Sequence, residues 1–114
     1  WDWDLQTDLV WWSEGFESLF GFKLTEIEST SESWTKRIHP DDRDRVVSGL
    51  ERIIKGSEAL WSDEYRFQCK DGAYATVHDR AYIIRDNTGR ALRAVGGMSD
   101  QTEQKKLEAQ YLRA

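Results

Sequence analysis

The second half of the chain contains three stretches in which apolar and polar residues alternate, separated by two tight turns. Strict alternation is typical of a strand that buries one face, and short turns join neighbouring strands in antiparallel order. This half therefore predicts three strands of an antiparallel sheet. The strands are residues 60–69, 74–84 and 92–98, and the turns are residues 70–72 and 86–89.

Two further strands are predicted near the start of the chain, at residues 1–5 and 9–12, with helical segments between them and the strand-rich half. Ser13 is a suitable N-cap for a short helix. Pro40 marks the start of a longer helix that runs to about Lys55, because proline is tolerated at a first helical position. Strands and helices that are segregated in this way predict an α+β fold, with helices on one face of the sheet.

The chain has 114 residues and a formal net charge of -5, which fits one domain without a nucleic-acid footprint. Cys69 is the lone cysteine, so an internal disulfide and a thiolate zinc site are excluded. This favours a cytoplasmic location.

No apolar run is long enough to span a bilayer, so we expect no direct membrane contact from this fragment. Both ends look cut from a longer protein, so any membrane anchor would lie outside this fragment.

Motifs for catalysis are missing from the sequence. It has no glycine-rich phosphate loop, no metal-binding pair of histidines, and no serine or cysteine with an evident base. His39 precedes Pro40, so we expect it to shape the start of the helix instead of binding a metal or haem. His78 falls on the outward face of its strand by alternation. We therefore predict no enzymatic activity for this chain alone, no metal site and no haem.

Five motifs, in the right order and at the right spacing, resemble the PAS domain over essentially the whole chain. The subtype is the one common in bacterial sensor histidine kinases and diguanylate cyclases. Two positions depart from its usual pattern, Thr76 in place of Trp and Gln101 in place of Ile or Val. The motifs are Trp1-Asp2-Trp3-Asp4-Leu5, His39-Pro40-Asp41-Asp42-Arg43, Glu64-Tyr65-Arg66, Lys70-Asp71-Gly72, and the segment from Val95-Gly96 to Asp100-Gln101-Thr102-Glu103.

The resemblance implies a five-stranded antiparallel sheet that cradles helices over a small pocket. It implies a sensory core over residues 1–100 and a signalling helix over residues 101–114, which leads to a downstream output domain of the same chain. That output would be a histidine kinase or a diguanylate cyclase. Light-sensing relatives use a cysteine in the helical segment to attack a flavin. Residues 30–38 contain none, so no covalent flavin is expected.

The side chains that face the pocket follow from alternation along the strands. Small residues among them would leave room, which Trp1, Trp3, Trp11 and Trp34 would fill. An alternative is that the aromatic residues simply form the core. Asp79 is the main polar member, and it would contact a ligand or take an internal partner, either an arginine or a tryptophan indole. The predicted pocket residues are Tyr65, Phe67, Val77, Asp79, Ala81, Ala94, Gly96, Met98 and Trp34.

The C-terminal helix is predicted to pass the signal to the downstream domain. Asp100 and Thr102 are good N-cap residues. Gln104, Leu107, Tyr111 and Ala114 follow the spacing of a coiled-coil seam, which predicts a homodimer that is weak in the isolated fragment. In the alternative, Leu107 and Tyr111 fold back onto their own sheet. Outward residues of the predicted sheet would add a second contact, namely Tyr74, Thr76 and Tyr82.

Three functions stay open at this level. The first is a sensory module that binds a small unknown ligand or relays a signal by dimerisation. The second is a ligand-free structural module whose purpose is dimerisation. The third is a redox or gas sensor with a bound cofactor. The fold alone does not choose among them.

Overall fold

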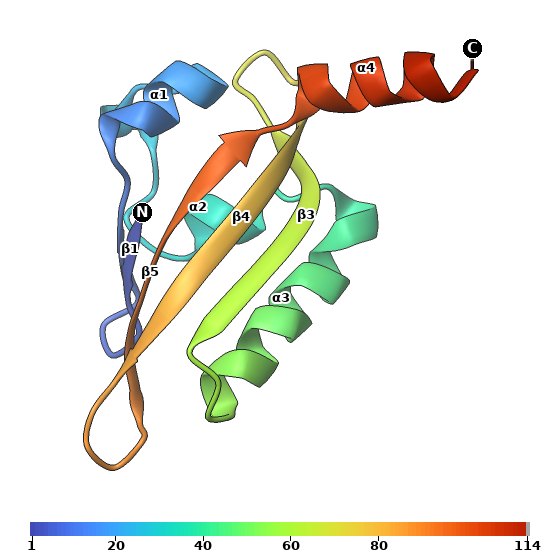
Figure 1. Cartoon of the computed structure of the whole chain (residues 1–114). Coiled ribbons are helices and arrows are strands. Elements are labelled where there is room, and N and C mark those ends of the chain that lie inside the picture. Colours follow the sequence, from blue (N-terminus) through green and yellow to red (C-terminus); the bar gives the residue numbers. More distant parts are fainter. Residues whose placement is uncertain (114) are drawn as a thin grey trace.

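A computed structural model describes residues 1–113 as one five-stranded antiparallel sheet with helices (Figure 1). The strand order is β2-β1-β5-β4-β3. The α+β class predicted from the sequence is confirmed. The elements in chain order are β1 (Asp2–Asp4), β2 (Leu9–Trp11), α1 (Glu14–Phe20), the 3-10 turn η1 (Leu24–Glu26), α2 (Glu32–Thr35), α3 (Pro40–Lys55), β3 (Leu60–Gln68), β4 (Tyr74–Arg85), β5 (Ala91–Asp100) and α4 (Thr102–Arg113).

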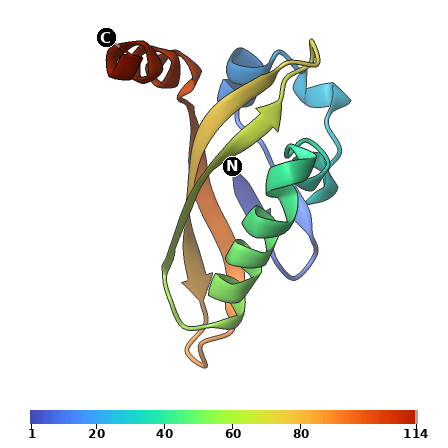
Figure 2. The ribbon, with the colours of Figure 1, turned by 90° about the vertical axis from the view of Figure 1, so that its right-hand side faces the viewer.

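The helices divide between the two sides of the sheet. Helices α2 and α3 lie along one side, whereas α4 leaves the end of β5 and extends away on the other side (Figure 2). Helix α1 covers the same face as α2 and α3, because its Phe16 and Phe20 pack against the buried Phe67 of β3, with ring centroids 6.0 and 4.8 Å apart. The sheet thus has a covered inner face and an outer face that its own helices leave open except near the start of α4.

Helix α3 begins and ends where the sequence indicates. Pro40 occupies the first turn, and the ring nitrogen Nδ1 of His39 accepts a hydrogen bond from the backbone N–H of Asp41 at 3.1 Å. The helix ends at Lys55. Val46 and Leu50, four positions apart, are buried against the sheet. The predicted role of His39 in starting this helix matches this geometry.

Side chains along the long strands point in turn to the inner and the outer face of the sheet. Tyr65 pairs with Val77 and Phe67 with Ala75, and all four side chains are buried on the inner face. At the neighbouring positions the side chains point outward. Leu60 and Tyr82 are paired across β3 and β4, yet they are 67% and 56% exposed.

One aromatic residue lies on the opposite face from that predicted. Trp11 was expected to fill the interior, but its side chain is 64% exposed on the outer face. Trp12, the next residue, is buried instead and packs against Phe16 with tilted rings whose centroids are 4.4 Å apart. Neighbouring residues of an extended chain point to opposite sides, so only one of the two tryptophans can enter the core.

Candidate functional site

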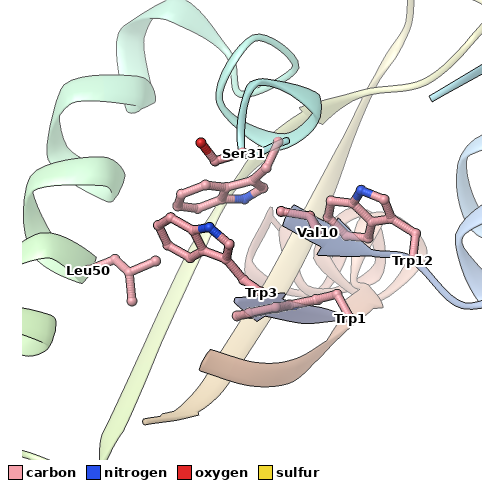
Figure 3. Close-up of a pocket in the computed structure, with 7 residues that line it drawn as sticks. Trp1, Trp3, Val10, Trp12, Ser31 and Leu50 are labelled. Carbon is pink, nitrogen blue, oxygen red and sulfur yellow. The ribbon is translucent and has the colours of Figure 1, made fainter. Parts of the chain in front are cut away.

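A small cavity of about 20 Å³ lies between the N-terminal hairpin and the helices (Figure 3). That volume is close to the space that a single water molecule needs. Four indole rings supply most of its wall, and Figure 3 shows three of them by label, on both sides of Val10. The lining residues are Trp1, Trp3, Val10, Trp12, Ser31, Trp34 and Leu50.

Each of the four indole N–H groups around this cavity is already hydrogen-bonded within the protein. The bonds therefore hold the rings in place, and the rings offer carbon surface to the cavity. A guest in this space would contact carbon and find no free indole donor. The bonds are Trp1 to Asp79 at 2.9 Å, Trp3 to Asp8 at 2.9 Å, Trp12 to Ser33 at 2.9 Å, and Trp34 to the hydroxyl of Tyr65 at 2.7 Å.

Asp79 is the centre of a buried polar network. Its side chain is 1% exposed, and its two oxygens accept hydrogen bonds from the indole of Trp1 and, at 2.7 Å, from the hydroxyl of Tyr65. Burial raises the pKa of Asp79 to about 6, although the two hydrogen bonds act in the opposite direction. The pKa of the Tyr65 hydroxyl is also raised, by burial and by the neighbouring carboxylate. The internal tryptophan partner that was one of the alternatives for Asp79 is therefore present.

The network ties distant parts of the chain together. Through Asp79, strand β4 is joined to Trp1 just before β1 and to Tyr65 on β3, and Tyr65 is joined in turn to Trp34 on α2. Trp1 and Trp34 also line the cavity. Any change in the cavity that moves either indole therefore acts on hydrogen bonds that reach the centre of the sheet.

The predicted pocket and the observed cavity share only Trp34. The strand residues that were expected to border a pocket are mostly packed in the core, with Gly96 and Met98 half-buried. Their ligand-binding role stays a prediction. Gly96 and Met98 border a second hollow of about 150 Å³, together with Trp1. The buried members are Tyr65, Phe67, Val77, Asp79, Ala81 and Ala94.

Gly96 is closely packed on β5. A Cβ atom at this position would collide with the backbone of Arg80, and it would lie 2.9 Å from the ring of Trp1. The space that a side chain would occupy is therefore taken by close packing of β4 and by an indole. The small size of Gly96 thus admits the ring of Trp1 to the interior.

The junction between β5 and α4 is fixed to strand β4. The backbone N–H of Gln101 donates to the carbonyl of Thr76 at 2.7 Å, and the N–H of Thr76 donates to the hydroxyl of Thr102 at 3.0 Å. Asp100 accepts from the N–H of Thr102 at 2.9 Å, as expected for a residue that caps a helix start. Thr76 thus anchors the helix through its backbone, which any residue type supplies.

An ion pair that sequence reasoning missed lies next to this junction. Lys105 of α4 is 3.1 Å from the carboxylate of Glu64, on the outer side of β3. Leu107 and Tyr111 point elsewhere and are 56% and 87% exposed. The alternative in which they fold back onto their own sheet is therefore wrong. The last predicted seam residue, Ala114, lies outside the described residues.

Metal binding finds no support in the part of the chain that the structure describes. Residues 1–113 hold no group of three His, Cys, Asp or Glu side chains arranged around a common point. The ring of His39 packs at a tilt against Tyr74, with centroids 4.6 Å apart. Burial raises the pKa of the Cys69 thiol, which disfavours the reactive thiolate.

Residues 9–98 match the family model described as PAS fold. The chain belongs to the PAS family. Sensor protein FixL of Bradyrhizobium diazoefficiens is 30% identical over 108 residues, which are 95% of this chain but 21% of FixL. A methyl sulfide methyltransferase-associated sensor of Methanosarcina acetivorans is 30% identical over 96 residues, which are 84% of this chain and 10% of that protein. This PAS domain therefore spans a small part of these relatives.

Two solved structures agree with this assignment. A sensory box histidine kinase/response regulator of Burkholderia thailandensis has a TM-score of 0.81 and 28% identity, covering 99% of this chain and 82% of that one. The N-terminal domain of a diguanylate cyclase of Marinobacter aquaeolei has a TM-score of 0.83 at 24% identity, covering 92% and 95%. The PAS domain is thus homologous to sensory modules of signal transduction. Residues 1–113 contain no helix that is long and apolar enough to cross a membrane.

Proposed function

We propose that this PAS domain receives a signal at its inner face and relays it through α4 to a downstream output domain of a longer protein. One observation carries the proposal. Helix α4 is anchored to β4 through Thr76, yet its apolar residues Leu107 and Tyr111 are left exposed. An anchored helix with an open apolar stripe is suited to transmit a movement of the sheet to whatever packs on that stripe.

The proposed partner on that stripe is the same helix of a second copy. Leu107 and Tyr111 are four positions apart and follow the spacing of a two-stranded coiled coil. A helix of 12 residues gives a seam that is marginal in water by itself. The homodimer is therefore weak for the isolated domain and firmer where a longer protein extends the helix. A signal would favour one arrangement of the paired helices over another.

The proposed role is regulatory and not catalytic, in a cytoplasmic part of the parent protein, and it needs no haem or covalent flavin. Pockets for drug-sized ligands usually have about 300–1,000 Å³, whereas the cavity here has about 20 Å³. A large cofactor would require the four tryptophans to repack and to give up internal hydrogen bonds. An absorption spectrum of freshly purified protein tests this proposal. A stoichiometric Soret or flavin band that survives gel filtration would contradict it.

A ligand-free structural role is the second candidate, and the small cavity favours it. Mass spectrometry of purified protein after denaturation separates the two. A released small molecule in a constant ratio to protein supports ligand sensing. Protein that never releases a ligand, in combination with intact dimerisation, supports the structural role.

The relay proposal is tested by sedimentation of a longer protein that includes the next domain. Leu107→Glu and Tyr111→Glu should weaken its dimer by roughly tenfold or more, because each puts a charge into an apolar seam. Ala109→Glu is the matched control, since Ala109 is also exposed on α4 but lies on the opposite side of the helix. If both seam variants dimerise as tightly as wild type, α4 does not hold the dimer.

A further inference from the structure

The hollow of about 150 Å³ between helix α1 and strand β5 has the one methionine of the chain, Met98, in its wall. Trp1, Trp12 and Phe16 give the same wall its aromatic surface. Hydrogen peroxide needs little more room than a water molecule, whose share of liquid volume is about 30 Å³. A small oxidant that enters the hollow therefore reaches the thioether of Met98.

Met98 and Cys69 are the two sulfur-containing residues of the chain, and they differ in what their oxidation requires. A cysteine reacts as its thiolate, and burial raises the pKa of the Cys69 thiol and disfavours that form. A thioether carries no proton, so the oxidation of Met98 requires access alone. Met98 is half-buried and lines the hollow. Of the two sulfur atoms, that of Met98 is therefore the more susceptible to a peroxide.

Met98 lies opposite Asp79 in the sheet. The two residues are cross-strand partners of β5 and β4, and the side chains of such a pair start about 5 Å apart on the same face. Trp1, whose indole donates to Asp79 at 2.9 Å, lines both the hollow and the small inner cavity. A chemical change at Met98 thus takes place beside the buried network that Asp79 holds together.

We propose that Met98 is a site of oxidation, at which a hydroperoxide that enters the hollow converts the thioether into a sulfoxide and loosens the hydrogen bonds of Asp79. A lone pair of the sulfur forms an S–O bond with one peroxide oxygen while the O–O bond breaks. The leaving hydroxide takes the proton of the transferred hydroxyl group and departs as water. The sulfur loses two electrons and the peroxide gains them. The inference goes beyond the proposed relay and does not depend on it.

The sulfoxide changes the balance of donors and acceptors in the network. Its oxygen accepts hydrogen bonds, whereas the thioether sulfur accepts them weakly. Both oxygens of Asp79 already accept, from Trp1 and Tyr65. A sulfoxide oxygen that turns toward them competes for the indole N–H of Trp1 or stays without a partner, and one that turns away puts a polar group on an apolar wall. Each outcome costs stability of the native state.

The oxidation of Met98 can be reversed. A methionine sulfoxide reductase uses a pair of thiols to return the thioether. The sulfoxide oxygen leaves as water, and the two thiols become a disulfide. Met98 would thereby register an oxidant and be reset, without any bound chromophore.

Treatment of the folded 114-residue chain with hydrogen peroxide, followed by mass spectrometry, tests the proposal. After tryptic cleavage, Met98 lies in the peptide of residues 94–105 and Cys69 in that of residues 67–70, so the added oxygen is assigned to one of them. We expect Met98 to react in the folded chain no more than about tenfold slower than in the chain unfolded by urea, because access governs this oxidation. Protection beyond that factor overturns the proposal.

Two variants of α1 test the route of the oxidant. Leu19 lines the hollow and is 36% exposed. Leu19→Ala widens the hollow and should speed the oxidation of Met98 severalfold, whereas Leu19→Trp narrows it and should slow the oxidation severalfold. Leu60→Ala is the matched control, since Leu60 is also an exposed leucine but lies on the outer face of β3. Equal rates in all these variants, with folding checked by circular dichroism, would contradict entry through the hollow.

The effect on the network is measured by urea unfolding of the oxidised protein. Oxidised wild type should unfold at a lower urea concentration than untreated protein, and the reductase with a dithiol should restore the midpoint. Met98→Leu, a change that nearly conserves volume, is the control, and its midpoint should not respond to peroxide. An equal fall in treated Met98→Leu would assign the loss to another residue, and an unchanged midpoint of oxidised wild type would show that the network is not loosened.

A variant of Asp79 connects the loss to the network itself. In Asp79→Asn the amide supplies a donor beside Met98, which the sulfoxide oxygen can use. Oxidation should therefore lower the urea midpoint of Asp79→Asn by less than it lowers that of the wild type, as expected for two residues in contact. An equal or larger fall in Asp79→Asn would contradict the competition for the indole of Trp1.

Discussion

The two faces of the sheet are built from the same alternating strands but differ in how far their aromatic side chains are buried. On the inner face, Trp34 and Tyr65 are buried, and their polar atoms are hydrogen-bonded to one another. On the outer face, Trp11 and Tyr82 are more than half exposed. The inner face is thus packed within one chain, whereas large side chains of the outer face are open to solvent. Substitutions on the two faces should accordingly affect different measurements.

The largest expected difference is between Phe67→Ala and Tyr82→Ala. Phe67 is fully buried and contacts Phe16, Phe20 and Tyr65, so its removal should lower the free energy of unfolding by about 3–5 kcal/mol. Tyr82→Ala, on the outer face, should change it by no more than about 0.5 kcal/mol in the monomer. Urea unfolding at low protein concentration measures both. Equal losses for the two variants would show that the faces do not differ as described.

A smaller difference is expected for tryptophan introduced at adjacent positions of β5. Ala94 is fully buried, so Ala94→Trp overpacks the core and should cost about 1–3 kcal/mol. Arg93→Trp is the matched control, because Arg93 is exposed on the outer face and loses mainly its pairing with Asp2. Denaturation midpoints compare the two. A midpoint for Ala94→Trp equal to that of wild type would mean that position 94 does not face a packed interior.

The smallest effect is a dependence of stability on pH. Because the pKa of Asp79 is raised from its ordinary value of 3.8 to about 6 in the fold, the native state holds a proton that the unfolded chain has released. Its contribution to stability is therefore present at low pH and is lost as pH rises through 6. Between pH 5 and 7 the loss is about 1 kcal/mol.

Asp79→Asn should abolish this part of the pH dependence. The asparagine is neutral at all these pH values, so the difference in unfolding free energy between variant and wild type should change by about 1 kcal/mol between pH 5 and 7. The carboxylates of Glu28 and Asp42, with pKa values of about 2, titrate below this range. A constant difference between variant and wild type across the range would refute the raised pKa.

The sheet and the helix after Pro40 could be predicted because their signals are local. Alternation over twelve residues of β4 fixes which side chains share a face, and Val77, Asp79 and Ala81 are buried as predicted. The N-terminal hairpin gives no such signal. Residues 9–12 are Leu-Val-Trp-Trp. All four are apolar, so there is no alternation to show whether Trp11 or Trp12 enters the core.

The cavity could not be located from the sequence for a different reason. Its position depends on where the indoles of Trp1 and Trp3 lie, and they are placed by partners distant along the chain, such as Asp79. Gly96 is small because an indole and a neighbouring strand approach it, and a sequence pattern cannot separate that cause from an empty pocket. The contact of Lys105 with Glu64 is equally non-local, because 41 positions separate the two residues.

The anchorage of α4 has a mechanical consequence. Because Gln101 and Thr102 are both bonded to Thr76, the start of α4 would follow a movement of β4, and the ion pair of Lys105 with Glu64 adds a second attachment to the sheet. Twelve residues at 1.5 Å each make an arm of about 18 Å. A tilt of about 10° at the start of the helix then moves the far end by roughly 3 Å, about the distance between the donor and acceptor of one hydrogen bond. In the proposed relay, a modest change in the twist of β4 would thereby become a displacement large enough to remake contacts beyond the domain.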